Sequence, residues 1–368
     1  MSTSKLFQPL QVGNLQLKNR IAMAPLTRFR ADENHVPLPM VAEYYAQRAS
    51  VPGTLLITEA TLISHQAGGY ANVPGIYTKE QIASWKKVTE AVHEKGSFIY
   101  LQLWALGRVA SPAQAEKEEI TIKTSSAVPL GEGYATPKEM TIEEIKQTIS
   151  DYAQAAKNAI EAGFDGVELH GANGYLIDQF LQDKVNQRTD EWGGSVENRS
   201  RFAFEATKAV VEAIGAKKTG IRLSPYSSFQ GMRMDDPLPQ FKDIIKKLDS
   251  FNDLAYIHLV ESRVDGNADM DDSPADKLEP FVDEFRNTVL IAGGFKPDSA
   301  HTLVDSQYSN KNVVVVFGRY FISTPDLVFR LQQGISLNEY NRDTFYLPMK
   351  AEGYTDYPFS KEFLSAKA

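Results

Sequence analysis

Three side chains that could hold a carbonyl and deliver a proton lie within six residues of one another. Residues 166–169 form an apolar run typical of a buried parallel strand, and the Asn-Gly pair at 173–174 predicts a turn just after it. His170, Asn173 and Tyr175 therefore cluster where the strand ends. An imidazole and an amide can hydrogen-bond a carbonyl oxygen, and a phenol can supply a proton. An ordinary turn with a histidine bonded to backbone is the alternative.

Two glycine-containing segments near the C-terminus have the composition of a phosphate site. Residues 291–295 read Ile-Ala-Gly-Gly-Phe and residues 317–320 read Phe-Gly-Arg-Tyr, each at the end of an apolar run. Glycines let backbone N–H groups approach phosphate oxygens, and an arginine adds a charged fork. Two tight turns are the alternative, but glycine at both strand ends favours phosphate. The residues concerned are Gly293, Gly294, Gly318 and Arg319.

Further polar and aromatic residues occur at or near the ends of other predicted strands. Gln102 offers a donor and an acceptor together, which suits a ring edge carrying both N–H and C=O. Arg222, between Ile and Leu, would either pair with a buried carboxylate or face negative charge on a ligand. Three aromatic residues would either cover a flat ligand or pack in its surroundings, namely Tyr70, Trp104 and Tyr346.

All these positions fit a single (β/α)8 barrel. The expected strands are residues 20–26, 54–60, 98–104, 166–170, 220–224, 256–260, 289–292 and 313–318. The expected helices between them are residues 79–95, 142–162, 198–214, 238–248, 275–285 and 325–332. Eight strands alternating with helices predict an α/β barrel in which the chemistry lies at the C-terminal strand ends, formed by one domain, residues 1–368.

Additional segments decorate this expected barrel. Residues 6–19 alternate apolar and polar positions around Val-Gly-Asn, which predicts an N-terminal β-hairpin that caps one end. Long loops follow the first, third and sixth strands, at residues 27–50, 105–140 and 261–273, and the first of them contains a short helix around 40–48. Because each follows a strand's C-terminal end, we expect these loops to form pocket walls.

Composition excludes several classes of function. The chain of 368 residues has a net charge of −8 and a pI near 5.4, which argues against nucleic acid and anionic membranes as partners. It contains no cysteine, and its six histidines lack metal-ligand spacing, so we expect no metal site. The polar N-terminus and the lack of a long apolar run predict a cytoplasmic protein, monomer or homodimer, acting on a small molecule.

One rim of the barrel would carry four features: the glycine–arginine phosphate site, the donor–acceptor side chain of Gln102, the cation Arg222, and the His/Asn/Tyr cluster. Together they suggest a phosphorylated flat heterocycle, and flavin mononucleotide (FMN) fits best.

Several motifs then resemble the old yellow enzyme family, in order along nearly the whole chain. They are Arg20-Ile-Ala-Met-Ala-Pro-Leu-Thr-Arg28, Leu101-Gln-Leu-Trp-Ala-Leu-Gly-Arg108, His170-Gly-Ala-Asn-Gly-Tyr-Leu-Ile-Asp-Gln-Phe180, Asn186-Gln-Arg-Thr-Asp-Glu-Trp-Gly-Gly194, Arg222-Leu-Ser-Pro225 and Phe317-Gly-Arg-Tyr-Phe-Ile322. The chain is most similar to filamentous-fungal members, including those that reduce chanoclavine aldehyde. The resemblance implies an FMN-dependent ene-reductase, reduced by NADPH, on a (β/α)8 barrel.

The resemblance also implies roles for individual residues. Thr27 would bond the flavin O4 side, Gln102 its pyrimidine edge, and Arg222 its N1 and O2. The full set of flavin contacts would be Pro25, Leu26, Thr27, Ala60, Gln102, His170, Arg222, Gly293, Gly294, Gly318 and Arg319. Substrate contacts would be His170, Asn173, Tyr70, Trp104 and Tyr346. His170 and Asn173 would polarise the substrate carbonyl, flavin N5 would give hydride to the β carbon of an enal, enone or nitroalkene, and Tyr175 would protonate the α carbon.

Three departures from the family pattern qualify this picture. Gly293-Gly294 stands where many members have Gly-Asn, a change that backbone binding of phosphate should tolerate. Residues 265–272 lack the bulky aromatic that some relatives place over the pocket, which predicts an open site. Tyr175 is kept where some alkaloid-pathway relatives have Phe, which favours net reduction over isomerisation.

Two alternatives stay open on the sequence. One is a dedicated secondary-metabolism reductase of the chanoclavine-aldehyde type. The other is a flavin-free barrel lyase or isomerase acting on a phosphorylated substrate, which would leave Gln102 and Thr27 without a purpose.

Overall fold

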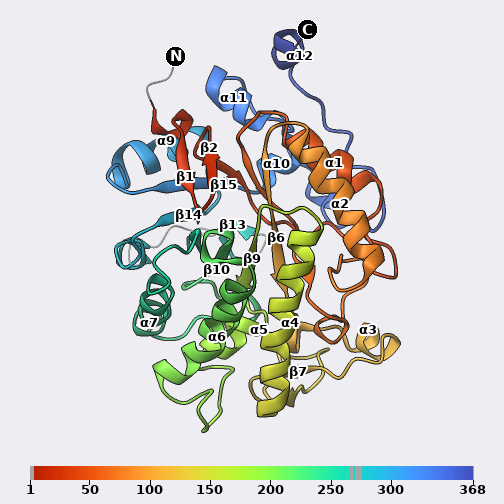
Figure 1. Cartoon of the computed structure of the whole chain (residues 1–368), viewed down its shortest axis with the longest axis vertical. Helices are drawn as coiled ribbons and strands as arrows, with labels where there is room; N and C mark the ends of the chain where they lie inside the picture. The colour runs from red at the N-terminus through yellow and green to blue at the C-terminus, as the bar shows by residue number, and fades with distance from the viewer. Residues whose placement is uncertain (1–3, 263, 266–267, 270–275, 368) are drawn as a thin grey trace.

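Eight parallel strands run through the centre of the molecule and helices lie outside them (Figure 1). The computed structural model describes residues 4–262, 264–265, 268–269 and 276–367. The eight strands are β3 (Ile21–Met23), β4 (Leu55–Ile57), β6 (Phe98–Trp104), β9 (Gly166–Gly171), β10 (Thr219–Leu223), β11 (Tyr256–Val260), β14 (Thr288–Ala292) and β15 (Val313–Phe317). Each pairs in parallel with the next along the chain, and β15 pairs with β3. The strands therefore form a closed barrel, and the predicted (β/α)8 fold is confirmed.

Alternate residues of each strand serve two different cores. In β15, Val314 and Val316 pack inside the barrel, whereas Val313, Val315 and Phe317 pack against the outer helices. This alternation follows from the two-residue period of a strand, and because both faces are covered, the strands are mostly apolar. Polar residues within such strands are therefore exceptions that need a reason.

A β-hairpin closes the N-terminal end of the barrel, as the sequence predicts. It consists of β1 (Leu10–Val12) and β2 (Leu15–Leu17), whose four leucine and valine side chains join the inner core. At its turn, Gly13 has φ +54° and lies so close to the Lys217 carbonyl that a Cβ would be 2.0 Å from the oxygen. The hairpin thus packs on the loops that lead into β10 and β11, which leaves the opposite end of the barrel for a ligand.

The outer layer contains both long amphipathic helices and short connecting ones. The helices are α1 (Met40–Arg48), α2 (Lys79–His93), α3 (Pro112–Lys117), α4 (Ile142–Glu161), α5 (Leu176–Leu181), α6 (Val196–Ile214), α7 (Leu238–Asp249), α8 (Glu279–Val282), α9 (Pro297–Thr302), α10 (Arg319–Ser323), α11 (Leu327–Gln333) and α12 (Lys361–Lys367). At the start of α4, Thr141 accepts from the N–H of Glu144, and the Glu144 side chain accepts from the N–H of Thr141. This capping box confirms the start that the sequence predicts.

The helix expected at residues 275–285 is much shorter in the structure. Residue 275 lies outside the described residues, and α8 covers only Glu279–Val282. Pro280 explains the late start, because a proline is tolerated in the first turn of a helix but not in its interior. The predicted helix was therefore wrong in its extent.

Short strands decorate the loops around the barrel. They are β5 (Thr61–Leu62), which extends the pairing at the end of β6, the pair β7 (Lys123–Thr124) and β8 (Lys138–Glu139), and the pair β12 (Val264–Asp265) and β13 (Ala268–Asp269). None of the helices described has the length and apolar character that crossing a membrane requires. Among the described residues, no group of three or more His, Asp or Glu side chains could hold a metal ion.

Candidate active site

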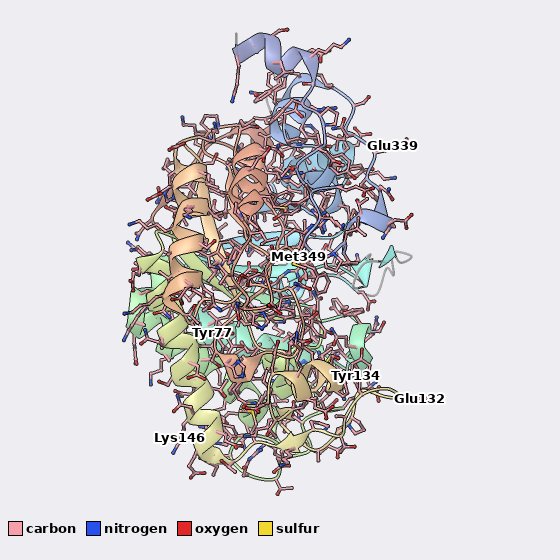
Figure 2. All side chains as sticks on the ribbon, turned by 90° about the vertical axis from the view of Figure 1, so that its right-hand side faces the viewer. Tyr77, Glu132, Tyr134, Lys146, Glu339 and Met349 are labelled. Carbon is pink, nitrogen blue, oxygen red and sulfur yellow. The ribbon has the colours of Figure 1, made fainter. Side chains whose placement is uncertain are left out.

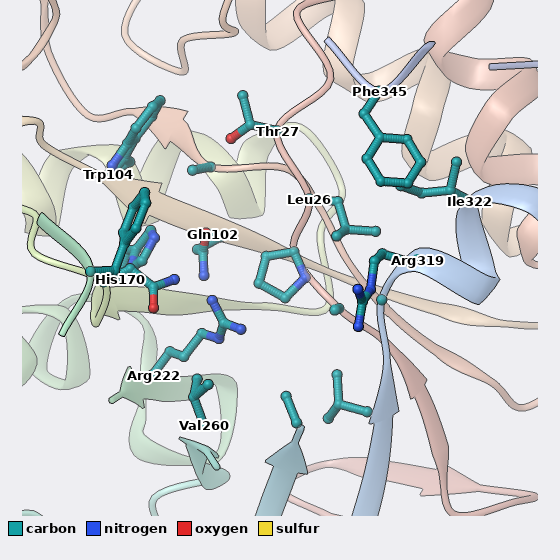
Figure 3. A pocket seen from close by; sticks show the side chains of 18 of the residues that line it. Leu26, Thr27, Gln102, Trp104, His170, Arg222, Val260, Arg319, Ile322 and Phe345 are labelled. Atoms are coloured by element: carbon teal, nitrogen blue, oxygen red, sulfur yellow. The ribbon is translucent and has the colours of Figure 1, made fainter. Parts of the chain in front are cut away.

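A cavity of about 570 Å³ opens at the C-terminal ends of the barrel strands. Its lining includes every residue that the sequence analysis assigned to catalysis, cofactor or substrate, from Pro25 after β3 to Arg319 after β15. In Figure 3, Gln102 lies centrally, with Arg222 and His170 on one side and Arg319 on the other. The structure thus brings the predicted residues together, and the cavity is of the size that small-molecule sites have.

His170 presents a donor to this cavity because its other ring nitrogen is engaged. The backbone N–H of Ala172 donates to His170 Nδ1 at 3.4 Å, so a neutral ring carries its proton on Nε2. Burial lowers the pKa of His170 well below its ordinary value, and the charge of the neighbouring Arg222 lowers it further. The side chain is therefore a neutral N–H donor at neutral pH.

Asn173 lies beside His170 because the chain turns sharply after β9. Its φ of +58° is left-handed, a conformation that asparagine tolerates better than most residues. Its backbone N–H donates to Ser224 Oγ at 2.8 Å, which ties this turn to the end of β10. The turn alternative and the ligand-binding alternative therefore do not exclude each other, since a well-anchored turn carries a side chain that lines the cavity.

Tyr175 is held by aromatic edges on two sides. Its ring centroid is 4.9 Å from that of Trp104 and 4.8 Å from that of His170, with interplanar angles of 85° and 64°. Burial raises the pKa of Tyr175, and neighbouring tyrosines, Tyr70 first among them, raise it further. The phenol is therefore protonated at neutral pH and can act only as an acid.

A residue that the sequence analysis did not identify contacts the Tyr175 hydroxyl. The Gln230 side chain hydrogen-bonds to the phenol and lowers the pKa of Tyr175, which partly offsets the effect of burial. Gln230 has a left-handed φ of +59°, and its carbonyl accepts from Arg108 Nη2 at 2.9 Å. This backbone geometry directs a loop side chain onto the phenol, and no pattern in the local sequence indicates it.

Beneath the cavity, a buried polar cluster crosses the barrel. Gln102 Nε2 donates to Glu168 Oε1 at 2.8 Å, and His258 Nδ1 lies 2.9 Å from Glu168 Oε2. Arg222 is adjacent in strand register to both His170 and His258, and the Glu168 charge raises the pKa of Arg222 against the larger lowering by burial. Arg222 thus interacts with a buried carboxylate and also lines the cavity, and its role toward a ligand stays a prediction.

The cavity has the polar atoms and the open backbone that a flavin nucleotide needs. Among the residues described, Arg222 Nε is buried without a hydrogen-bond partner, which leaves a donor for a ligand. A Cβ on Gly293 would lie 2.1 Å from Glu261 Oε2, so a side chain there would clash unless Glu261 moved. Gly294 has φ +65°, a left-handed conformation that glycine adopts without strain. A Cβ added to Gly318 would have no protein atom nearer than 3.5 Å, which leaves space for a ligand. These features fit FMN.

Comparison with known proteins agrees with this geometry. A family model described as "NADH:flavin oxidoreductase / NADH oxidase family" matches residues 5–338. Chanoclavine-I aldehyde reductase fgaOx3 of Penicillium roqueforti (strain FM164) is 57% identical over 366 residues, which cover 99% of this chain and 98% of the relative. The crystal structure of Old Yellow Enzyme from Pichia sp. AKU4542 matches with a TM-score of 0.90 and 38% identity, covering 98% of this chain and 94% of that one. The chain belongs to the old yellow enzyme family.

Membership in this family makes the protein an FMN-dependent oxidoreductase of the ene-reductase type. A further relative, the NADP-dependent oxidoreductase lnbE of Aspergillus flavus, is 54% identical over 367 residues, covering 98% of this chain and 97% of the relative. The family also rules against the flavin-free lyase or isomerase considered from the sequence.

One wall of this old yellow enzyme cavity comes from the C-terminal segment, which two buried arginines anchor. Arg28 and Arg30 donate to backbone carbonyls between residues 344 and 353 at 2.8–3.2 Å. Both side chains are fully buried, and Phe29 between them packs edge-on against Tyr346, with ring centroids 5.8 Å apart. Phe345 and Tyr346 thereby reach the cavity from a segment far along the chain.

The three predicted aromatic contacts differ in their surroundings. Trp104 is fully buried and supports Tyr175 from behind, with Tyr70 packed edge-on against it at 5.8 Å between ring centroids. Tyr346, which lines the cavity, is 48% exposed, and Tyr134, on the loop between β7 and β8, is 40% exposed. Figure 2 labels Tyr134 and, above it, Met349, whose N–H donates to the carbonyl of Phe29.

Most of residues 265–272, from which the sequence analysis predicts an open pocket, lie outside the described residues. Elsewhere the cavity has apolar linings that the sequence analysis did not identify, because ordinary core residues give no separate signal. They are Ala24, Phe29, Phe229, Val260, Ala292, Phe295, Val316, Tyr320, Ile322 and Phe345.

Proposed function

We propose that the protein uses NADPH to reduce the carbon–carbon double bond of α,β-unsaturated aldehydes and ketones, with nitroalkenes as further substrates. One observation carries the proposal: a neutral His170 with its N–H free for the cavity stands edge-on to a protonated Tyr175, with Asn173 in the same turn. Two donors and one acid are what carbonyl polarisation and carbon protonation require.

In this proposal His170 Nε2 and the Asn173 amide donate to the substrate carbonyl oxygen. Their hydrogen bonds strengthen as negative charge develops on that oxygen, and one such donor is typically worth about 10²–10³ in rate. When bound, FMN supplies hydride equivalents from its N5 atom to the β carbon. Tyr175 then gives its proton to the α carbon, and Gln230 stabilises the phenolate that is left.

The cofactor-binding residues keep the roles that the family resemblance implies. Gln102 and Thr27 contact the polar edge of the flavin, Ala60 backs the ring, and Arg222 stabilises negative charge on its reduced form. Pro25 and Leu26 line the flavin, and the backbone at Gly293, Gly294, Gly318 and Arg319 holds the phosphate. NADPH as donor is supported by the resemblance to the NADP-dependent oxidoreductase lnbE.

A second candidate is one dedicated substrate of the chanoclavine-aldehyde type. The 57% sequence identity with a chanoclavine-I aldehyde reductase favours it, as does the aromatic rim of the cavity, where Phe229 and Tyr346 are each at least 37% exposed. Such a rim suits a substrate with a flat ring system.

The visible spectrum of the purified protein tests the proposal. Recorded without oxygen, a yellow protein should bleach with NADPH and regain its colour with 2-cyclohexenone, and NADH serves as the matched comparison for the donor. Bleaching without recovery would contradict broad enone reduction. Turnover of chanoclavine aldehyde against 2-cyclohexenone then separates the candidates, since a large preference for cyclohexenone argues against the dedicated role.

A further inference from the structure

Glu168 is an unusual side chain for the interior of this barrel. It lies in the middle of β9 and is fully buried, as is its partner His258. Removing a carboxylate from water is costly unless hydrogen bonds and charges compensate it, and an apolar residue would fill the same volume without that cost. A buried carboxylate directly below a cofactor cavity therefore needs an explanation beyond packing.

We propose that Glu168 is a positioning residue for the cofactor: it fixes the direction of the Gln102 amide and balances the charge of Arg222. The proposal concerns the flavin site alone and does not depend on which alkene is reduced.

The hydrogen bonds determine how the Gln102 amide faces. An ionised carboxylate can only accept, so the group 2.8 Å from Glu168 Oε1 must be the NH2 end of the amide. The carbonyl end of Gln102 is thereby turned away from Glu168. The edge of a flavin pyrimidine ring places an N–H between two carbonyl oxygens, and an amide with a fixed carbonyl and one spare N–H complements it. A freely turning amide would present the wrong group in part of the molecules.

His258 fixes Glu168 in turn. Its Nδ1 lies 2.9 Å from Glu168 Oε2, so both carboxylate oxygens are engaged from opposite sides. Burial lowers the pKa of His258, more than the neighbouring Glu168 charge raises it, so the ring donates as a neutral group. The chain of contacts from His258 through Glu168 to Gln102 consists entirely of buried side chains, which leaves little freedom for any of them.

The negative charge of Glu168 also acts on Arg222, the cation of the same buried cluster. Arg222 is buried at the cavity, and the residues beside it in strand register are the two histidines His170 and His258, both of which burial keeps neutral. Glu168 is the acid whose charge acts most strongly on Arg222. Without that negative charge, the positive charge of Arg222 would act on the flavin uncompensated and favour the anionic reduced form.

The experiment compares Glu168→Gln and Glu168→Asp with the wild-type holoenzyme. Two quantities are measured: the dissociation constant of FMN, from the fluorescence released on dilution, and the midpoint potential of the bound flavin, from equilibration with a reference dye. Thr207→Val in α6 serves as a control, because Thr207 is equally buried but its hydroxyl bonds only to the Ala203 carbonyl, away from the site.

Glu168→Gln removes the charge and frees the Gln102 amide to turn. We expect FMN to bind about 3- to 10-fold more weakly, the effect of about one hydrogen bond, and the potential to shift to more positive values. Glu168→Asp keeps the charge but is too short to reach both partners. We expect it to weaken FMN binding while its potential stays near that of the wild type.

A double-mutant comparison keeps the proposal testable if either variant is unstable. If Glu168 acts through Gln102, then adding Glu168→Gln to Gln102→Ala should weaken FMN binding no further than Gln102→Ala alone. Strictly additive losses would overturn the positioning role. An unchanged FMN affinity and potential in Glu168→Gln, or the same changes in Thr207→Val, would overturn the proposal as a whole. Neither measurement uses an alkene, so failure of the proposed substrate class would leave this test unaffected.

Discussion

Replacing Tyr175 by Phe removes one hydroxyl and little else. The ring of Tyr175 is held by its edge contacts with Trp104 and His170, and a phenylalanine ring keeps both. The hydroxyl's contact is with the Gln230 side chain. The variant should therefore fold and bind FMN as the wild type does, while losing the acid that the proposed mechanism requires.

The size of the effect follows from the role assigned to the hydroxyl. General acid catalysis by a positioned side chain contributes about 10²–10⁴ in rate, which corresponds to about 3–5 kcal/mol of transition-state stabilisation. Solvent is an ineffective replacement here, because Trp104 and Tyr70 pack behind the phenol. We expect alkene reduction to slow by at least about 10²-fold and flavin reduction by NADPH to change less than about twofold.

Anaerobic stopped-flow absorbance separates these two steps in one preparation. The reduced protein is mixed with 2-cyclohexenone and flavin reoxidation is followed, and the oxidised protein is mixed with NADPH in a second experiment. An unchanged rate of reoxidation would refute the assignment of Tyr175 as the acid. Equal slowing of both steps would point instead to a disturbed flavin site.

Three further predictions concern the surroundings of this acid. Burial lowers the pKa of His170 and raises that of Tyr175, so neither group changes protonation near neutrality. The rate of flavin reoxidation should therefore be constant between about pH 6 and 8. A tenfold change across that interval would contradict the roles assigned to His170 and Tyr175. Gln230→Leu should slow flavin reoxidation by the enone about 3- to 10-fold, because the phenolate loses about one hydrogen bond, while flavin reduction by NADPH stays unchanged. Wild-type reoxidation in this variant would show that the contact between Gln230 and Tyr175 is only structural. Arg30→Met should lower the free energy of unfolding by about 3 kcal/mol or more, measured by urea denaturation, because four backbone carbonyls, two of them buried, lose a hydrogen bond from the guanidinium. A loss below about 1 kcal/mol would mean that the C-terminal segment holds its place without this anchor.

The sequence predicted the barrel and its rim because both depend on local signals. Apolar runs of strand length fix the eight strands, and glycine or polar residues at their ends mark the cavity, as at Gly318 and Gln102. Parallel strands bring all such ends to one edge, so the residues that approach the cavity could be named without coordinates. The structure places these residues around one cavity, and their individual roles stay predictions.

What the sequence left out depends on long-range contacts or on unusual backbone geometry. Gln230 reaches Tyr175 through a left-handed backbone conformation that glutamine rarely adopts. Glu168 was counted within the apolar run 166–169, and its hydrogen-bond partners, which come from two other strands, could not be read from that run. Phe345 lines the cavity because Arg28 and Arg30 hold a segment more than 300 positions away, and no local pattern encodes such a contact.

Because the barrel closes between its first and last strands, the cofactor would stabilise the fold as well as take part in the chemistry. The first strand, β3, pairs directly with the last, β15, and a Cβ on Gly318 after β15 would lie 3.5 Å from the Leu26 side chain after β3. FMN bound here would contact residues that directly follow the first and the last strand of the barrel. A ligand that binds only the closed form stabilises it in proportion to the logarithm of ligand concentration over Kd. Bound FMN would therefore stabilise the pairing of β3 with β15, and its loss would weaken the closure of the barrel.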